Sequence, residues 1–239
     1  MEGAQQALVQ GELYVRGQGE SYVREGAAAD PNQDPNPNPD SDQAPDPVPT
    51  LPATPVVLRG DGLVLREWTE DDVPAMAELF DEPGIAHRTP LASPFDLAAA
   101  RAYLDRARDT RADGTRLQLV VTEDGVTPLG EVLLASLGAE RPAGAVTLGY
   151  AIGAAHRGRR LALRATRLLT EYAHTTLGLR RLRLQIEADN AASTGVARAA
   201  GYRLRADVPP TEVTQKGRTY TLQVWEHEQE AEAASRAGR

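Results

Sequence analysis

The stretch AHRGRRLALRATRLLTEYAHTTLGLRRLRLQIEADNAASTGVARAAGY, residues 155–202, carries the clearest structural pattern of this chain. A basic turn opens a segment from Gly158 to Leu177 whose apolar residues recur at helical spacing, and Gly178 follows as a helix-ending glycine. Residues 181–187 alternate between polar and apolar, which predicts a strand with one buried face. The alanine-rich residues 191–200 predict a short helix. The stretch therefore predicts a long helix, a strand and a short helix in succession.

Further elements are predicted on either side of this stretch. The segment VLRGDGLVLR at 57–66 predicts a hairpin that turns at Gly60-Asp61-Gly62. Thr69 is expected to cap a helix running to about Phe80, and a second helix is expected over 96–110. Alternation predicts strands over 116–122, 129–137, 145–153 and 219–226, with one more beginning at Tyr202. This order favours an α/β (mixed α+β) domain, in which helices cover both faces of a mixed sheet.

Composition divides the chain into four parts. Residues 1–26 contain an imperfect repeat, GELYVRGQ and GESYVREG, which would form at best a weak hairpin. Residues 27–55 are rich in Pro, Asp and Asn and are expected to be a disordered linker. The folded domain is expected over 56–229, followed by a tail at 230–239.

Charge and composition exclude several classes of function. The net charge is −8, and residues 1–56, with nine acidic and two basic residues, account for seven of these charges. A nearly neutral domain argues against nonspecific binding of nucleic acid. The chain has no cysteine, and its four histidines lack the spacing of metal ligands, so no metal is expected. We see neither a membrane-spanning apolar run nor a signal peptide, and therefore expect a cytoplasmic protein.

The turn at the start of the long helix has the chemistry of an anion site. Free amides at a helix N-terminus and the helix dipole favour phosphate, and Gly158 allows a close approach of the backbone. Arg157, Arg159 and Arg160 add positive charge. Taken alone, this pattern also fits arginines on a solvated helix start.

Two motifs together resemble the GNAT superfamily of acyl-CoA-dependent N-acyltransferases, in particular its ribosomal-protein N-terminal (Rim-type) acetyltransferase branch. Residues 157–162, RGRRLA, resemble the pyrophosphate loop Arg/Gln-x-x-Gly-x-Gly/Ala, with Arg160 in place of a glycine. We expect Arg160 to be helical with a negative φ, where arginine is allowed. Residues 189–193, DNAAS, and the later Gly201-Tyr202 resemble the D-N-x-x-S … K-x-G-F/Y motif of the Rim-type branch.

The resemblance implies the GNAT fold, with a central mixed and mostly antiparallel sheet flanked by helices, and acetyl-CoA as the cosubstrate. It implies that one strand backbone pairs with the pantetheine arm and that the amides of the basic turn hold the pyrophosphate. The implied cofactor-binding residues are Tyr150, Ala151, Ile152, Arg157, Gly158, Arg159, Arg160, Leu161, Ala162, Asn190 and Ser193.

The implied reaction is acetyl transfer to a primary amine by direct attack on the thioester. Many members of the superfamily place a proton-donating tyrosine where this chain has Ala197, and the resemblance makes Ser193 the hydrogen-bond donor to the leaving thiol instead. The amide of Ile152 is expected to meet the thioester oxygen. A base must take the proton of the amine, and Glu131, Glu187 and a relayed water are the alternatives.

The sequence leaves the partners open. The acceptor is either a protein N-terminus or a small amine, and the protein is either a monomer or a homodimer. One alternative is a non-catalytic GNAT-like module that binds acyl-CoA as a sensor or scaffold. Another is an interaction protein whose acidic N-terminal segment recruits a partner.

Overall fold

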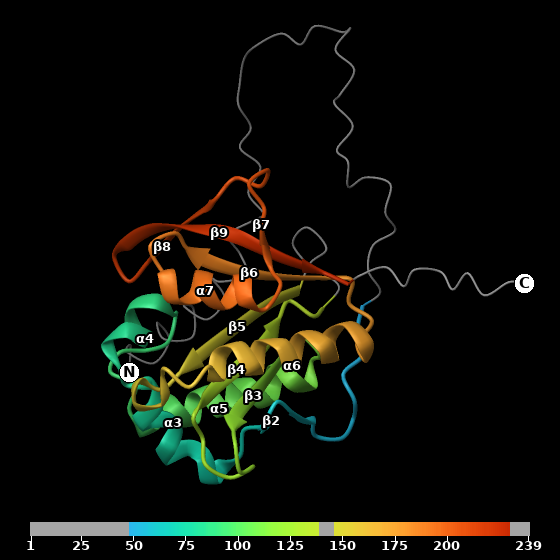
Figure 1. Ribbon diagram of the computed structural model, residues 1–239. Helices are drawn as coiled ribbons and strands as arrows, with labels where there is room; N and C mark the ends of the chain where they lie inside the picture. The colour runs from blue at the N-terminus through green and yellow to red at the C-terminus, as the bar shows by residue number, and fades with distance from the viewer. Residues whose placement is uncertain (1–47, 139–145, 230–239) are drawn as a thin grey trace, which may run out of the picture.

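The computed structural model describes residues 48–138 and 146–229. The two-copy repeat, most of the expected linker and the C-terminal tail lie outside these residues. Within the described ranges, nine strands form a single sheet with the order β1-β2-β3-β4-β5-β6-β9-β7, and β8 also pairs with β9 (Figure 1). All pairings are antiparallel except that of β5 with β6. The predicted mixed and mostly antiparallel sheet is therefore confirmed.

The strands agree closely with the sequence pattern in the middle of the domain. They are β1 (Val57–Gly60), β2 (Leu63–Glu67), β3 (Arg116–Thr122), β4 (Gly130–Ala135), β5 (Val146–Ile152), β6 (Arg181–Glu187), β7 (Arg203–Leu204), β8 (Thr211–Gln215) and β9 (Arg218–Glu228).

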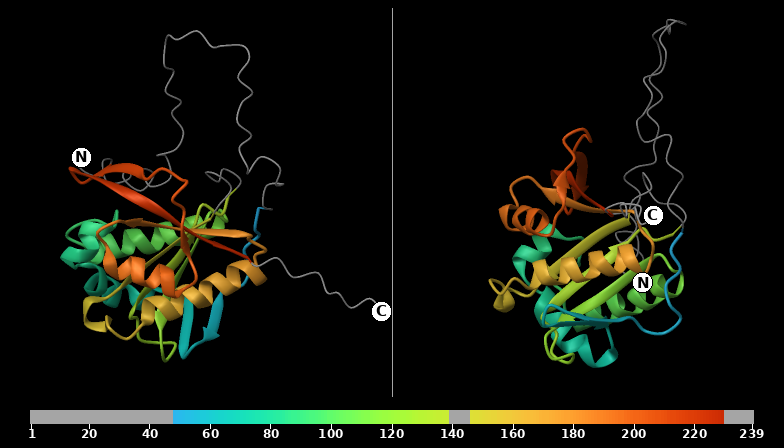
Figure 2. Two further views of the ribbon diagram at one scale, coloured as in Figure 1. Left: turned by 45° about the horizontal axis from the view of Figure 1, so that its top comes forward. Right: turned by 45° about the vertical axis from the view of Figure 1, so that its right-hand side comes forward.

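The helices cover both faces of the sheet. They are the 3-10 turns η1 (Glu70–Asp72) and η3 (Ala154–His156) and the helices α3 (Val73–Phe80), α4 (Pro83–Arg88), α5 (Leu97–Ala112), α6 (Leu161–Thr175) and α7 (Ala191–Ala199). α6 crosses the front of the sheet as seen in Figure 1, whereas α3 and α5 lie behind it, and Figure 2 shows the same layers from two other directions.

The core is divided by the sheet into two apolar layers. On one face, the buried stripe Leu161, Ala165, Leu169 and Ala173 of α6 packs against the sheet. On the other face, α3 and α5 enclose an aromatic cluster in which Phe80 makes edge-to-face contacts with Trp68, Phe95 and Tyr103. Burial of two independent faces fixes the register of the central strands, because a slip by one residue would exchange the layers.

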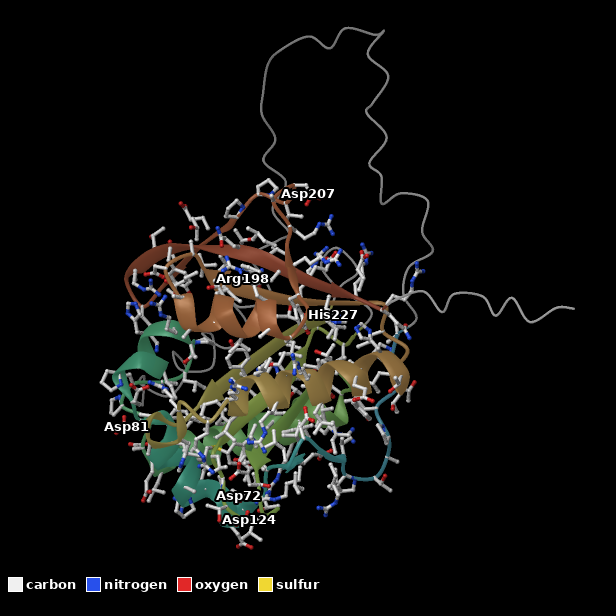
Figure 3. The ribbon with its side chains drawn as sticks, viewed as in Figure 1. Asp72, Asp81, Asp124, Arg198, Asp207 and His227 are labelled. Carbon is white, nitrogen blue, oxygen red and sulfur yellow. The ribbon has the colours of Figure 1, made fainter. Side chains whose placement is uncertain are left out.

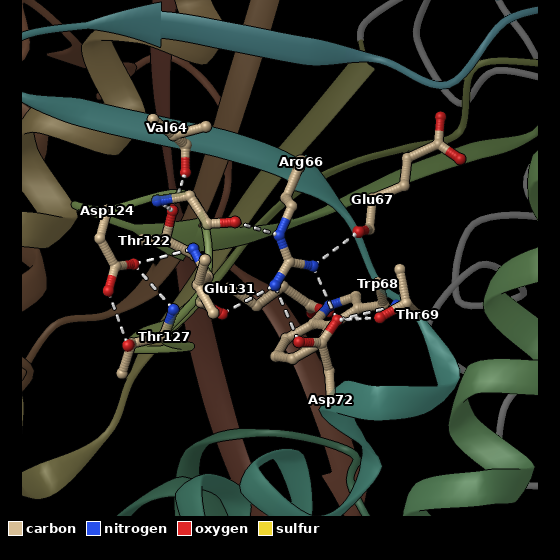
Figure 4. A network of polar contacts seen from close by, with 12 residues as sticks. Val64, Arg66, Glu67, Trp68, Thr69, Asp72, Thr122, Asp124, Thr127 and Glu131 are labelled. Atoms are coloured by element: carbon tan, nitrogen blue, oxygen red, sulfur yellow. Dashed lines mark hydrogen bonds and ion pairs between the residues drawn. The ribbon is translucent and has the colours of Figure 1, made fainter.

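The first predicted helix is interrupted. The expected helix from Thr69 to Phe80 is split into η1 and α3, with Pro74 in the first turn of α3, where a missing amide costs least. Asp72 accepts hydrogen bonds from the amide and hydroxyl of Thr69, both 2.8 Å long, and forms an ion pair with Arg66. Arg66 also donates to the carbonyls of Gly125 and Val126, so this network joins β2 to the loop after β3 (Figure 4). Asp72 and Asp124 accordingly lie together at one end of the molecule (Figure 3).

Two tight hairpins have left-handed residues at both central positions of the turn. Asp61 and Gly62 have φ of 49° and 68°, and Lys216 and Gly217 have φ of 51° and 72°, as a type I′ turn requires. The first hairpin is the predicted one. The second joins β8, which the sequence pattern does not predict, to β9.

Contacts with the domain begin upstream of residue 56. Leu51 is 8% exposed and belongs to the core layer under α6. Arg111 of α5 donates to the carbonyl of Pro52 over 2.6 Å. Residues 48–55, which the sequence places in the linker, therefore pack against the folded domain.

Candidate active site

The sheet opens between its two parallel strands. β5 pairs with β6 only through Val146–Leu182 and Thr147–Arg183, whereas its other edge pairs with β4 as far as Ile152. The strands diverge beyond this point (Figure 1). The backbone of residues 149–152 therefore has no neighbouring strand on the β6 side. An extended ligand could supply the missing pairing, as in β-strand addition.

A groove of about 590 Å³ lies on the α6 and α7 side of this opening. It is lined by residues 150–152 of β5, the turn before α6 and the outward face of α7, which is built from small residues: Ala192, Ser193, Gly195 and Ala199. A Cβ added at Gly195 would meet no atom within 4 Å, so the groove is open at this point.

A second cavity, of about 220 Å³, lies on the opposite face of the sheet. Its floor includes the small residues Ala135, Thr147, Gly149 and Ala151, and the segment after α4, with Tyr103 of α5, forms its walls. Lys216, at the tip of the β8–β9 hairpin, donates to the carbonyls of Ala86 and Thr89 over 2.7 and 3.2 Å. The hairpin is thereby fastened to α4 beside the cavity.

The groove and the cavity meet at the opening of the sheet. Both are lined by the same six residues: Arg88, Thr89, Tyr150, Ala151, Asn190 and Ser193. The Tyr150 hydroxyl is buried and has no hydrogen-bond partner in the described part of the chain. Burial raises the pKa of Tyr150, and the neighbouring Ser193 side chain partly offsets this rise. A ligand held in the groove would thus reach the cavity past two hydroxyl groups.

The N-terminus of α6 differs from the prediction. The helix begins at Leu161 rather than Gly158, and Arg160 is left-handed, with φ 57° and ψ 22°. The expectation of a negative φ at Arg160 is therefore wrong: this residue ends the turn as the N-cap and does not start the helix. Gly158 is left-handed as well, with φ 81°. Left-handed residues in such a turn direct successive amides toward one point, a geometry that binds anions.

The three arginines of the turn have different surroundings. Arg157 donates one hydrogen bond to the carbonyl of Ile152 and another to the carboxylate of Glu82. The bond to Glu82 is the main reason that the pKa of Glu82 is lowered. Arg159 pairs with Glu123 and does not line the groove. Arg160 lines the groove and forms no ion pair within the described residues. Of the three, Arg160 is thus the cation available to a bound anion.

The start of α7 holds Asn190 and Ser193 in place. The Asn190 side chain caps the helix by accepting a hydrogen bond from the amide of Ser193 over 3.2 Å. Ala197, one turn further on, is fully buried, so this position does not reach the groove.

The two candidate bases have opposite environments. Glu131 is 3% exposed and accepts hydrogen bonds from Trp68 Nε1 and the Tyr103 hydroxyl, at 2.7 and 2.6 Å. Burial raises its pKa despite these two donors. Glu187 accepts two hydrogen bonds from Arg218, which lower its pKa, and also pairs with Arg88. Glu187 is therefore the weaker base, and its carboxylate is held by arginines.

Several residues of the cavity could not be recognised in the sequence. Arg88, Tyr103 and Arg116 line the cavity from three separate segments, and Trp68 joins the site through its hydrogen bond to Glu131. The two candidate bases of the sequence analysis, Glu131 and Glu187, both line this cavity. Among the described residues, no three His, Cys, Asp or Glu side chains are grouped so that they could hold a metal ion.

The sequence of this chain matches a known protein family. The family model of the acetyltransferase (GNAT) domain matches residues 62–203, more than half of the chain. The chain belongs to the GNAT acetyltransferase family. The predicted family and fold are thereby confirmed, and this GNAT domain contains both motifs that carried the resemblance. A search of curated proteins found no match.

Solved structures with the same fold include Rim-type enzymes. A putative ribosomal-protein-serine acetyltransferase from Vibrio cholerae superposes on this GNAT domain with a TM-score of 0.61 at 18% identity, covering 73% of this chain and 98% of that one. A ribosomal-protein-S5-alanine acetyltransferase from Vibrio fischeri gives 0.62 at 16% identity, covering 72% and 96%. RimJ of Mycobacterium smegmatis, solved in complex with CoA-disulfide, gives 0.58 at 19% identity, covering 71% and 85%. At these identities the likeness shows the fold.

No helix within the described ranges is both long and apolar enough to cross a membrane.

Proposed function

We propose that this GNAT domain transfers an acetyl group from acetyl-CoA to a primary amine, with the cosubstrate in the groove and the acceptor in the cavity on the other face of the sheet. The observation that carries this proposal is the opening between β5 and β6, where the groove and the cavity share six lining residues. Such a passage allows two ligands held on opposite faces of the sheet to react with each other.

The groove residues fit acetyl-CoA. The unpaired edge of Tyr150, Ala151 and Ile152 offers backbone donors and acceptors to the amides of a pantetheine arm. The amides at the start of α6, with Arg160 beside them, suit a pyrophosphate. The small side chains of α7 leave room for an adenosine or pantetheine group. The residues present therefore fit the group that the family uses.

The positions of Glu131 and Ile152 give each of them a role in the attack of the amine on the thioester. The amine must be neutral to attack, and a lysine-like amine has an ordinary pKa of about 10.4. Glu131, with its raised pKa and its place in the cavity, is the base that takes this proton, directly or through one water. The amide of Ile152 donates to the thioester oxygen as negative charge develops there.

The leaving thiolate is met on the groove side. Ser193 donates a hydrogen bond to it, and Tyr150 is a second donor, because its buried hydroxyl forms no hydrogen bond within residues 48–138 and 146–229. A thiol has an ordinary pKa of about 8.5, so two hydroxyl donors are sufficient and a tyrosine at position 197 is not required.

The direct test uses acetyl-CoA and a panel of amines, namely short amidated peptides with each of several N-terminal residues, together with small amines. Mass spectrometry should show acetylation of at least one amine, with release of an equal amount of CoA thiol. Binding of acetyl-CoA without acetylation of any amine would instead support the non-catalytic alternative. Turnover that survives deletion of residues 1–47 would place the activity in the described domain.

A further inference from the structure

The acceptor cavity contains a cation that forms no hydrogen bond or ion pair with the described residues. Arg116, the first residue of β3, lines the cavity and forms no hydrogen bond or ion pair within the described part of the chain. The other arginine that lines the cavity, Arg88, is held by Glu187 and Asp189 at 3.2 and 2.7 Å. Arg116 is therefore the uncommitted positive charge of this cavity.

Arg116 and Glu131 mark opposite ends of the cavity. Arg116 of β3 is paired with Ala135 of β4. Glu131 lies four residues before Ala135 on β4 and on the same face of the sheet. Four residues of a strand span about 13 Å, which separates the Cα atoms of Glu131 and Ala135. Glu131 pairs with Ala151 at the opening of the sheet, so its carboxylate lies at the reacting end. Arg116 enters the cavity from the remote end, and its charge acts on Glu131 without forming an ion pair with it.

The residues of the cavity floor between these two ends are uncharged. The floor is made by Leu133, Ala135, Thr147 and Gly149. Because most of these side chains are small, the cavity has room for a ligand. The guanidinium of Arg116 stays protonated at all relevant pH values. Its planar set of donors matches a carboxylate with two parallel hydrogen bonds. A cavity with a base at one end and a free guanidinium at the other is complementary to a ligand with an amine and an anion.

We propose that the acceptor is an amine that carries a carboxylate in the same residue, with the amine at Glu131 and the carboxylate on Arg116. This inference rests on the proposed acetyl transfer and names its acceptor class. The carboxylate has two sources: a small ω-amino acid, or a peptide whose N-terminal residue is acidic. The cavity of about 220 Å³ is large enough for one such residue.

The test compares matched acceptors that differ only in this charge. One pair is 4-aminobutyrate and 4-aminobutanamide, and the other is a C-terminally amidated tetrapeptide that begins with Glu or with Gln. The wild-type kcat/KM should favour the carboxylate member of at least one pair by about tenfold, as expected for a bidentate charged contact. Which pair responds distinguishes the two sources.

Variants connect this preference to Arg116. Arg116→Gln should bring the ratio close to one, mainly through KM, and Arg116→Lys should give an intermediate ratio because the charge remains and the planar fork is lost. Arg101→Gln removes an exposed arginine of α5 outside the cavity and should leave the ratio unchanged. Melting temperatures of all variants establish that they are folded.

Two results would overturn the inference. One is a wild-type ratio of one or less for both pairs, while other amines are acetylated. The other is a carboxylate preference that persists in folded Arg116→Gln. Failure to acetylate any amine would instead refute the proposed function itself, so the two failures are distinguishable.

Discussion

Tyr150 of β5 and Ser193 of α7 lie next to each other where the groove and the cavity meet, and each lines both. One residue comes from the strand whose edge is free and the other from the first turn of the helix over that edge. Because the strands part at this point, two hydroxyl groups converge on the passage through the sheet.

Replacement of Tyr150 by Phe should separate activity from stability. The hydroxyl is buried and forms no hydrogen bond with the residues that the structure describes, a state that costs about 1–3 kcal/mol, so Tyr150→Phe should not lower the melting temperature. If the hydroxyl protonates the leaving thiolate, kcat should fall by about tenfold to a hundredfold. Thiol-release kinetics and thermal unfolding measure the two effects.

Ser193→Ala is the matched comparison for this experiment. We expect it to lower kcat to a similar degree, and the double variant should lose less than the product of the two single losses if both hydroxyls serve the same sulfur. A stable Tyr150→Phe with unchanged kcat would remove Tyr150 from the mechanism.

Substitutions of Gly195 test whether acetyl-CoA binds in the groove. Gly195→Ala should raise the stability of α7 by about 0.5–1 kcal/mol, because glycine is a poor helix former and the added Cβ meets no atom. Gly195→Leu should also fold, but its side chain would enter the groove and raise KM for acetyl-CoA at least about tenfold. Unchanged acetyl-CoA kinetics in a folded Gly195→Leu would place the cosubstrate elsewhere.

Arg160 combines an unfavourable backbone conformation with a useful charge. A left-handed non-glycine residue costs about 1–2 kcal/mol, so Arg160→Gly should raise the free energy of unfolding, while Arg160→Ala should not. Both variants lose the charge in the groove and should bind CoA more weakly, most clearly at low salt. Calorimetric titration at two salt concentrations, with urea unfolding, checks both statements. Equal stability of the Gly and Ala variants would contradict the strained geometry.

The Glu187–Arg218 ion pair should make stability depend on acidic pH. Arg218 lowers the pKa of Glu187 below its ordinary value of 4.5, so the folded state holds this proton less tightly than the unfolded state. The resulting stabilisation is complete above about pH 4.5 and is lost as the pH falls through the lowered pKa. We expect Glu187→Gln to cost about 1–2 kcal/mol at pH 7 and less at pH 3.

Urea unfolding of the wild type and of Glu187→Gln at several pH values between 3 and 7 checks this prediction. A difference in stability that stays constant over this range would mean that the pair contributes no pH-dependent stabilisation.

The sequence was sufficient for the central strands and the long helices because their apolar periodicity is strong. β3, β6 and α7 begin within one residue of the predicted positions, and Gly178 follows the end of α6 as expected. β8 was missed because its turn is Lys216-Gly217, which lacks the asparagine or aspartate typical of a type I′ turn. α4 was missed because six residues that begin with Pro-Gly carry no helical periodicity.

The site was harder to predict than the fold. The motifs located the groove, because a helix N-terminus and a capped short helix are local features. The cavity is lined by residues of several strands, including β3, β4, β5 and β6, and of α4 and α5, so the roles of Arg116 and Tyr103 depend on contacts between distant segments. The expectation of a negative φ at Arg160 is wrong because α6 begins at Leu161 and not at Gly158, which leaves Arg160 in the turn before the helix. The helical periodicity of the sequence does not locate that start to the residue.

The proposed mechanism places the thiol of CoA beside Ser193, and a cysteine at this position can detect that thiol. The chain has no cysteine, so Ser193→Cys introduces a single thiol, which can exchange with CoA disulfide to form a mixed disulfide and release one CoA thiolate. Thr194→Cys, on the next residue of α7 and outside both the groove and the cavity, is the control. Intact-mass spectrometry over time should show rapid addition of one CoA to Ser193→Cys, suppressed by excess acetyl-CoA, and slow addition to Thr194→Cys. Equal rates in the two variants, unaffected by acetyl-CoA, would contradict the proposed placement of the thioester and the mechanism built on it.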